Sequence, residues 1–301
     1  MKKANTKTSN YPKPILKWVG GKGAILNTLI AKFPAHINNY HEPFLGGASV
    51  LFALLNCVRT GSIVVSGTIY AYDANEPLVH VYKNIQTNPD EFYVCIQTII
   101  AGYTSFPDIK DKEVQTRESF YYTIRTNYNA MTLEEKCSVY GSAMFVFLNK
   151  TGFRGMFREG PRGFNIPYGN YSNPEIVNKS HLDEIHLLIQ GVVFESCDFS
   201  TSMARIVEGD FVYLDPPYAA EMKTSFVGYT KEGFGATHNS CLFSMCDALV
   251  CKLMMSNANV EIVRTHFTPN KKYSTDTIVC KRSINSKKPE STAVEVIITN
   301  Y

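Results

Sequence analysis

Residues 211–218 read Phe-Val-Tyr-Leu-Asp-Pro-Pro-Tyr, and this stretch determines how the chain is interpreted. The first four residues are aromatic or apolar and favour a buried β-strand. Pro216 and Pro217 cannot continue a central strand, so the strand must end at or near Asp215. Open α/β sheets bind ligands at the carboxyl ends of their strands. We therefore predict that Asp215 lies at a ligand-binding edge of a sheet.

The same unit of strand, turn and helix occurs twice near the amino terminus. Residues 38–44 lead into Gly46-Gly47 and an apolar helical run over 48–55. The β-rich run Ile69–Tyr72 ends on Asp73, and Asn75-Glu76-Pro77 then opens another helix. Repetition of this unit predicts a doubly wound, Rossmann-like α/β sheet with mainly parallel strands.

The middle of the chain breaks this pattern. Residues 78–190 have mainly helical periodicity and predict an inserted domain containing a β-hairpin. The α/β domain then comprises residues 11–77 and 191–301, while residues 1–10 are expected to be disordered. Three further segments are predicted to complete the sheet, namely 192–195, 261–263 and 294–298.

Asp215-Pro216-Pro217-Tyr218 has the groups needed to act on an aromatic amino nitrogen. The lone pair of such a nitrogen is delocalised, and two acceptors on its hydrogens would localise it for attack on a methyl group. The Asp215 carboxylate and a backbone carbonyl of the rigid proline pair provide such acceptors. Tyr218 offers a face on which an extruded base can stack. For these four residues alone, an ordinary proline turn is an equally good interpretation.

Two other segments of the sequence indicate that the protein binds a nucleoside and a nucleic acid. The glycines at 46 and 47 permit close approach of the backbone, and Asp73 is placed to accept hydrogen bonds from ribose hydroxyls. The pyrophosphate motif GxGxxG and the triphosphate motif GxxxxGK[ST] are both absent from the sequence. Residues 149–171 interleave arginines with aromatics and glycines, which suits a loop lying against DNA; the alternative is a flexible surface hairpin.

Seven motifs, in order, resemble those of the Dam-type, DPPY-containing, alpha-class family of site-specific DNA adenine-N6 methyltransferases. They are Pro14–Lys22, Glu42–Gly47, Asp73, Asn149–Tyr171, Asp198-Phe199, Asp215–Tyr218, and the ending Lys281–Asn285 to Glu295–Tyr301. The resemblance covers nearly the whole chain. It implies transfer of a methyl group from S-adenosyl-L-methionine to N6 of an adenine, with S-adenosyl-L-homocysteine as product. The chain departs from the family's FxGxG pattern, because the second glycine of Phe44-Leu45-Gly46-Gly47 is shifted.

The resemblance also assigns roles to individual residues. The catalytic residues would be Asp215, Pro216, Pro217 and Tyr218. The cofactor would be bound by Trp18, Gly21, Lys22, Glu42, Pro43, Phe44, Gly46, Asp73, Asp198, Phe199 and Asp215. DNA would be contacted by Lys17, Phe153, Arg154, Met156, Arg158, Pro167 and Tyr171. Arg158 is the expected reader of a guanine, whereas many relatives carry a shorter amide at the position of Arg154.

The target by this resemblance is a short palindrome in double-stranded DNA, GATC in the first place and another four-base site such as CATG as the alternative. The loop from Gly228 to Phe234 resembles a family segment that closes near the active site. Lys281, Arg282, Lys287 and Lys288 would add phosphate contacts.

The composition of the chain limits which classes of protein and partner remain possible. The formal charge of +3 permits a polyanionic partner without requiring one, and the apolar stretches are too short to cross a membrane. The eight cysteines lack CxxC pairs and the seven histidines are dispersed, so we predict reduced thiols and no metal requirement. We also predict an intracellular protein, cytoplasmic or nucleoid-associated, that is not secreted. We expect a monomer, or a dimer on DNA, with a cognate restriction endonuclease as a further partner in restriction-modification.

Two alternatives stay open from the sequence. One is methyl transfer to RNA or to a protein amide, which would use a similar amino-group site. The other is a catalytically inactive, DNA-binding homologue. The arginine-rich 149–171 segment favours DNA over the first alternative, and the intact Asp215–Tyr218 motif favours catalysis over the second.

Overall fold

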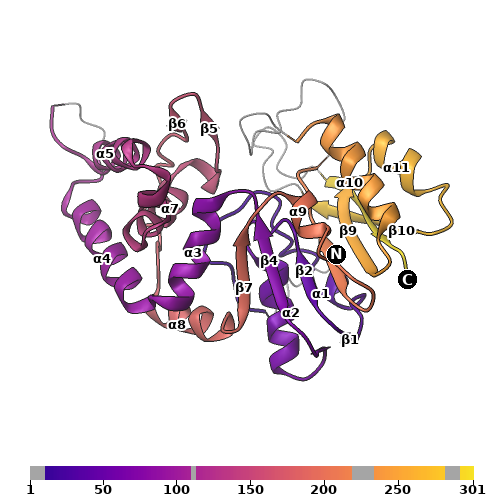
Figure 1. The fold of residues 1–301 in the computed structure, drawn as a ribbon. Helices are drawn as coiled ribbons and strands as arrows, with labels where there is room; N and C mark the ends of the chain where they lie inside the picture. The colour runs from indigo at the N-terminus through magenta and orange to yellow at the C-terminus, as the bar shows by residue number, and fades with distance from the viewer. Residues whose placement is uncertain (1–10, 110–112, 219–233, 282–291) are drawn as a thin grey trace, which may run out of the picture.

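The computed structural model describes residues 11–109, 113–218, 234–281 and 292–301 (Figure 1). Its centre is a seven-stranded sheet with the order β10-β11-β9-β8-β2-β4-β7. The bounds of these strands are β2 Tyr40–Glu42, β4 Ile69–Asp73, β7 Val192–Ser196, β8 Phe211–Leu214, β9 Lys252–Ala258, β10 Ser274–Lys281 and β11 Thr292–Thr299. Two short strands, β1 His36–Ile37 and β3 Val64–Val65, form a separate parallel pair.

The direction of the strands determines where a ligand can bind. The strands from β9 to β7 run parallel, whereas β11 is antiparallel to β9 and β10 is antiparallel to β11. Of these strands β2 is the first in the chain, and it pairs with β4 on one side and β8 on the other. The strand order therefore reverses at β2, which opens a crevice at the carboxyl ends of β2 and β8. The predicted Rossmann-like α/β class is confirmed.

Strand β8 forms because both faces of the sheet are covered. Phe211 and Tyr213 pack into one hydrophobic cluster, whereas Val212 and Leu214 pack into another. Alternate side chains of a strand point to opposite faces, so this division means that helices cover the sheet on each side. A strand buried in this way is expected to read as a continuous apolar run, and residues 211–214 do.

The helices on the sheet include one correction to the sequence analysis. Their bounds are α1 Leu26–Ile30, α2 Ser49–Arg59, α3 Glu76–Thr87, α9 Phe199–Met203, α10 Ala236–Ala248 and α11 Glu261–Phe267. The strand predicted at residues 261–263 is wrong, because these residues open α11. Val263 and Phe267 are buried four residues apart, which is a helical spacing, while Ile262 is 36% exposed. Strand β9, which precedes α11, was not predicted.

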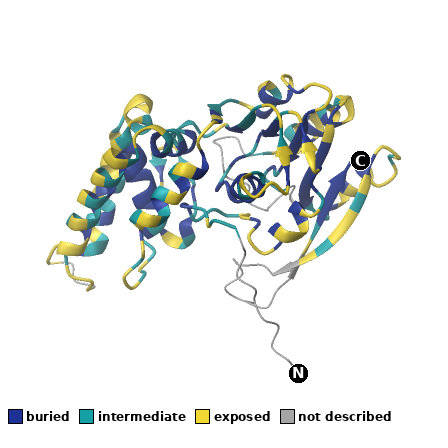
Figure 2. Cartoon of the chain, turned by 90° about the horizontal axis from the view of Figure 1, so that it is seen from below, coloured by how far each residue is buried: buried dark blue, intermediate teal, exposed yellow. Residues whose placement is uncertain are grey.

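A second group of helices lies beside the sheet, at the left in Figure 1. It consists of α4 Pro89–Ser105, α5 Arg117–Ala130, α6 Leu133–Cys137, α7 Val139–Thr151 and α8 Lys179–Leu188. Between α7 and α8 the chain forms the 3-10 turn η1 Phe153–Gly155 and a hairpin of β5 Glu159–Gly160 and β6 Gly163–Phe164. All residues from 141 to 149 are buried, so α7 is the central helix of this group. The exposed faces belong to the surrounding helices, as Figure 2 shows.

Helix α3 connects the two parts. It packs against β7 and β4 of the sheet and against α4, α6 and α7 of the helical group. The predicted domain boundary at residue 78 therefore falls inside a helix. None of the helices in the described ranges combines the length and the apolar character needed to cross a bilayer.

Candidate active site

One cavity of about 1050 Å³ follows the carboxyl ends of β2, β4 and β8. Every residue predicted to act in catalysis or to bind the cofactor lines it. These are Trp18, Gly21, Lys22, Glu42, Pro43, Phe44, Gly46, Asp73, Asp198, Phe199, Asp215, Pro216, Pro217 and Tyr218. The cavity is also lined from the helical group, by residues of α5, α6 and the β5–β6 hairpin. A space of this size accommodates a nucleoside and a second ring system.

Asp215, the first residue after β8, is held on both carboxylate oxygens. Lys22 Nζ lies 2.6 Å from Oδ2, and Ser256 donates a hydrogen bond of 3.0 Å to Oδ1. Ser256 belongs to the neighbouring strand β9, and its hydroxyl lies 2.8 Å from the hydroxyl of Tyr213. Burial raises the pKa of Asp215, while Lys22 and Ser256 act in the opposite direction. The carboxylate is thus positioned by two partners that are distant from it in the chain.

Lys22 is a buried cation, only 3% exposed. Its ammonium group also donates a hydrogen bond of 2.6 Å to the carbonyl oxygen of Gly20 and lies 4.8 Å from the centre of the Tyr218 ring. Asp215 is the anion that directly neutralises it. An amino group that approaches Oδ2 must therefore share this oxygen with Lys22 or displace it.

Tyr218 is held at its hydroxyl end. It donates a hydrogen bond of 2.8 Å to Glu295 Oε2 on β11. Burial is the main reason why its pKa is raised above the ordinary value, and the charges of Asp215 and Glu295 add to this effect. The tyrosine is therefore a neutral aromatic ring with a fixed orientation in the cavity.

Glu42, the last residue of β2, is a buried acid in the same cavity. Tyr40 donates a hydrogen bond of 2.7 Å to its Oε2. Burial raises the pKa of Glu42 to about 8; the charge of Asp215 adds to this, and the Tyr40 hydrogen bond and Lys22 oppose it. At neutral pH this side chain is mainly protonated, and so it can donate a hydrogen bond as well as accept one.

Asp73, the last residue of β4, is fixed by two backbone hydrogen bonds. Gly46 N donates to Oδ2 and Asn75 N donates to Oδ1, both at 2.9 Å. Burial raises the pKa of Asp73, and these two hydrogen bonds lower it. Gly46 has a φ of +47°, a conformation that favours glycine. Hydrogen bonding therefore holds the turn after β2 against the end of β4 at the edge of the cavity.

Trp18 covers this turn. Its indole stacks on Phe157, with ring centres 5.9 Å apart. A Cβ atom added to Gly46 would lie 2.9 Å from the indole ring, and one added to Gly47 would lie 2.8 Å from Trp18 Cβ. From the sequence these glycines are predicted to let a ligand approach the backbone; in the structure they also make room for Trp18.

Three phenylalanines form an aromatic wall on another side of the cavity. Phe44 stacks on Phe199 with ring centres 5.6 Å apart, and Phe234 lies 5.8 Å from Phe44 and 5.7 Å from Phe199. Asp198 caps α9 by accepting a hydrogen bond of 2.8 Å from Ser200 N. Such a wall suits the flat face of a purine.

The residues predicted to contact DNA lie outside the cavity. Lys17 Nζ lies 4.0 Å from the centre of the Tyr171 ring, and the Tyr171 hydroxyl accepts a hydrogen bond of 2.7 Å from Arg154 N. Arg154 has a φ of +58°, which is rare for a residue with a side chain. Asn149 joins this group to Lys17 through hydrogen bonds of 2.8 and 2.7 Å to its backbone.

The other predicted DNA contacts follow along the 149–171 segment. Arg158 Nε donates a hydrogen bond of 2.6 Å to Asn165 Oδ1, across the base of the β5–β6 hairpin. Phe153 N donates to Pro167 O at 2.8 Å, and the Phe153 ring is 40% exposed. Met156 packs partly against the core. The hairpin turn then brings Arg162 to the cavity, a residue that the sequence analysis did not select.

Several residues around the site were missed. Ser256, Tyr213 and Glu295 hold the catalytic motif, but each is an ordinary strand residue in the sequence. Asn129, Leu133 and Lys136 line the cavity from the helical group, and no local motif marks them. Lys281 ends β10, while the residues from Gly228 to Gly233, together with Arg282, Lys287 and Lys288, lie outside the described residues.

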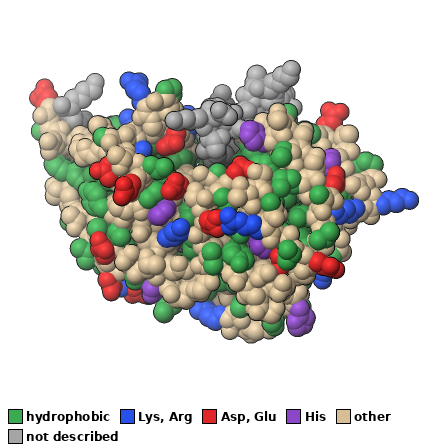
Figure 3. Space-filling view, in the orientation of Figure 1, with side chains coloured by type: hydrophobic (Ala, Val, Ile, Leu, Met, Phe, Trp, Pro, Cys, Tyr) green, Lys and Arg blue, Asp and Glu red, His purple; other side chains and the backbone are tan. Residues whose placement is uncertain are grey.

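Surface charge by itself does not locate the site. On the face shown in Figure 3, the described basic side chains are scattered among acidic ones rather than gathered in one patch. This agrees with the small formal charge of +3.

Comparison with known proteins identifies the family. Residues 18–279 match the family described as D12 class N6 adenine-specific DNA methyltransferase. The Type II methyltransferase M.MjaIII of Methanocaldococcus jannaschii is 33% identical, covering 96% of this chain and 99% of the relative. The Retron Ec67 DNA adenine methylase of Escherichia coli is 30% identical, covering 94% and 90%. The DNA adenine methylase of Haemophilus influenzae is 27% identical, covering 87% and 85%. The chain belongs to the D12 class of N6 adenine-specific DNA methyltransferases.

Proposed function

We propose that this enzyme uses S-adenosylmethionine to methylate N6 of an adenine that is extruded from a short palindromic site in duplex DNA. One observation supports this most directly. Asp215 shares a single cavity with Asp73 and with the aromatic wall of Phe44 and Phe199. This arrangement offers one place for a nucleoside and, beside it, an acceptor for an amino group.

The residues of the cavity fit the proposed cofactor. Asp73 is a fixed carboxylate at the end of β4, where ribose hydroxyls can donate to it. Asp198-Phe199 and Phe44 would hold the adenine, while Trp18, Gly21 and Lys22 would lie near the methionine end. S-adenosylmethionine supplies an electrophilic methyl group on a positively charged sulfur. Neither a metal nor an acid is needed to activate that group.

Asp215 would prepare the target nitrogen. As its carboxylate and a backbone carbonyl of the proline pair accept the two amino hydrogens, the nitrogen lone pair becomes available. A bond from nitrogen to the methyl carbon then forms while the carbon–sulfur bond breaks, and its electron pair stays on sulfur. The nitrogen loses one proton, which Asp215 can accept because burial raises its pKa. Tyr218, fixed by Glu295, would stack on the extruded base.

The 149–171 segment and Lys17 would read the sequence of the duplex. Arg158 is proposed to contact a guanine, with Phe153, Arg154, Met156, Pro167 and Tyr171 contributing the other contacts. We propose residues 78–190 as the target-recognition unit and GATC as the site, with CATG as the alternative. Action as a monomer inside the cell, and pairing with a restriction endonuclease, belong to the same proposal.

The test is methylation of a whole genome. The purified enzyme is incubated with labelled S-adenosylmethionine and DNA from a methylation-free bacterium, and modified bases are mapped by single-molecule sequencing. We expect N6-methyladenine in one four-base palindrome. The Asp215→Ala variant should label DNA at least about a hundredfold more slowly, whereas Asp276→Ala, which removes a surface partner of Lys32, should label normally.

The same assay separates the alternatives. Label in RNA or protein but not in DNA would overturn the proposed substrate. DNA binding without label in any substrate would indicate the inactive homologue. Methylation of adenines in no common sequence would contradict site specificity but not the transfer reaction.

A further inference from the structure

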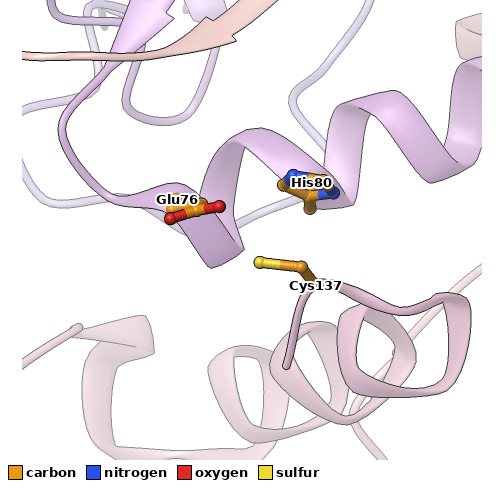
Figure 4. A group of neighbouring side chains, drawn as sticks. All are labelled: Glu76, His80 and Cys137. Carbon is orange, nitrogen blue, oxygen red and sulfur yellow. The ribbon is translucent and has the colours of Figure 1, made fainter. Parts of the chain in front are cut away.

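Glu76 and His80 of α3 and Cys137 at the end of α6 lie close together (Figure 4). One potential ligand atom from each residue lies within 4.8 Å of the others. All three side chains are half-buried. Glu76 also borders the active-site cavity, but His80 and Cys137 do not line it, and none of the three has a part in the proposed transfer.

The scaffold explains why the three side chains meet. Glu76 and His80 are four residues apart on α3 and therefore share one face of the helix. Asn84 continues this face, and its Nδ2 donates hydrogen bonds of 3.0 Å to Cys137 O and 2.8 Å to Ser142 Oγ. These bonds attach the end of α6 to α3 through the backbone. The position of Cys137 is thus determined by groups other than its thiol.

The donor set has a definite chemical preference. A thiolate, an imidazole and a carboxylate are the ligands that zinc uses, with bonds of about 2.0–2.3 Å. A tetrahedral ion with such bonds has ligand atoms about 3.5 Å apart. The three groups would therefore have to approach one another by up to about 1.3 Å, which side-chain rotations can provide. Magnesium and calcium prefer oxygen ligands alone and fit the group poorly.

We propose that Glu76, His80 and Cys137 bind one thiophilic divalent cation, zinc by its chemistry, with the fourth position taken by water. On binding, a sulfur–metal bond replaces the sulfur–hydrogen bond of Cys137, and the proton passes to solvent. His80 binds through a neutral ring nitrogen. The ion joins α3, which begins directly after Asn75 at the cavity edge, to α6 of the helical group.

The environment of His80 supports this assignment. Burial lowers the pKa of His80 and Lys83 adds to this, whereas Glu76 and a hydrogen bond to the backbone of Cys137 raise it. The ring is therefore neutral at physiological pH. Metal-bound histidines commonly use their other ring nitrogen to hydrogen-bond a backbone carbonyl. Burial raises the pKa of Cys137 to about 11, and a bound cation removes this barrier by replacing the proton.

Cobalt titration of the full-length, tag-free enzyme tests the proposal. Co²⁺ bound to a thiolate gives a charge-transfer absorption band, which should saturate at one ion per chain and disappear when zinc is added. The band should be lost in Cys137→Ser and retained in Cys95→Ser, a matched change of another half-buried cysteine in the helical group. His80→Gln should weaken cobalt binding by about tenfold or more.

Three results would overturn the proposal: no band in the wild type, an unchanged band in Cys137→Ser, or equal loss of the band in Cys95→Ser. Circular dichroism checks that each variant is folded. If Cys137→Ser does not fold, the same cobalt titration is carried out on His80→Gln and Glu76→Gln. Unchanged cobalt affinity in both variants would exclude the site. Methylation is not the readout, so this test can fail while the proposed function holds.

Discussion

The active-site cavity and the 149–171 segment are ordered in different ways. In the cavity, Lys22, Glu42 and Asp215 are largely buried and linked to one another or to fixed hydroxyl groups. In the 149–171 segment, the backbone is fixed by hydrogen bonds such as Phe153 to Pro167, while Phe153 and Pro167 themselves are exposed. The proposed chemistry would thus depend on buried, linked side chains, and the proposed recognition on exposed side chains carried by a fixed backbone.

This difference has a physical reason. A group that stabilises developing charge must be oriented before the reaction, because reorganisation during the reaction costs free energy. A side chain that reads a base edge must leave its surface free for a partner that is absent until DNA binds. Single substitutions in the cavity should therefore strongly reduce activity, whereas substitutions in the 149–171 segment should mainly change which DNA sequence is methylated.

The largest effect is expected for Asp215→Ala. It removes the acceptor of the target amino group and should lower kcat by about a hundredfold or more. Affinity for S-adenosylmethionine, measured by calorimetry, should change little. Because Lys22 would remain as a buried cation, circular dichroism must show that the variant is folded. Near-normal turnover would contradict the proposed mechanism and remove the contrast between the two regions.

A smaller but still large effect is expected for Gly47→Ala. The new methyl group would lie 2.8 Å from Trp18 Cβ, so Trp18 must move. Overpacking of this kind costs about 1–3 kcal/mol, and we expect cofactor affinity to fall by about tenfold or more. Gly23→Ala is the matched control, because an added Cβ atom there meets nothing within 4 Å. Equal affinities in both variants would show that Trp18 does not shape the cofactor site.

Arg158→Ala tests the 149–171 segment. The loss of a guanine contact should reduce discrimination at one base position by about 1–3 kcal/mol and leave kcat on a saturating site nearly unchanged. Steady-state kinetics on a set of duplexes, each with one altered base pair, measures this. Uniform weakening on every duplex would instead make Arg158 a phosphate contact.

The smallest effect concerns Glu42 and pH. Its pKa is raised to about 8 from an ordinary value of 4.5. Between these values the unfolded chain releases a proton that the folded chain keeps, so this acid destabilises the fold increasingly as pH rises from about 4.5 to about 8. Glu42→Gln should raise Tm by several °C at pH 8.5 and by much less at pH 5.

Thermal unfolding of the wild type, Glu42→Gln and the exposed control Glu134→Gln at both pH values checks this prediction. The same gain in Tm at pH 5 and pH 8.5 would show that Glu42 titrates normally, and that the cavity does not hold it protonated.

Prediction from sequence succeeded where structure and chemistry are local. The turns after 38–44, 69–72 and 211–214 carry their functional residues directly behind their strands, and parallel strands bring these ends to one edge. For this reason the cavity residues behind these strands could be predicted from the sequence, whereas Trp18, Gly21 and Lys22 were predicted from the family resemblance alone. Short apolar runs do not distinguish strand from helix, which is why residues 261–263 were misassigned.

The sequence by itself determined the α/β class, the Asp215–Tyr218 motif and the cavity residues that directly follow β2, β4 and β8, because each depends on neighbours within one strand and one turn. Only the tertiary structure decided that Lys22 pairs with Asp215, that Trp18 covers the glycine turn, and that Ser256 and Glu295 hold the motif. It also brought Cys137 to α3. These partners lie far apart in the chain, and their pairing depends on which strands and helices become neighbours when the core packs.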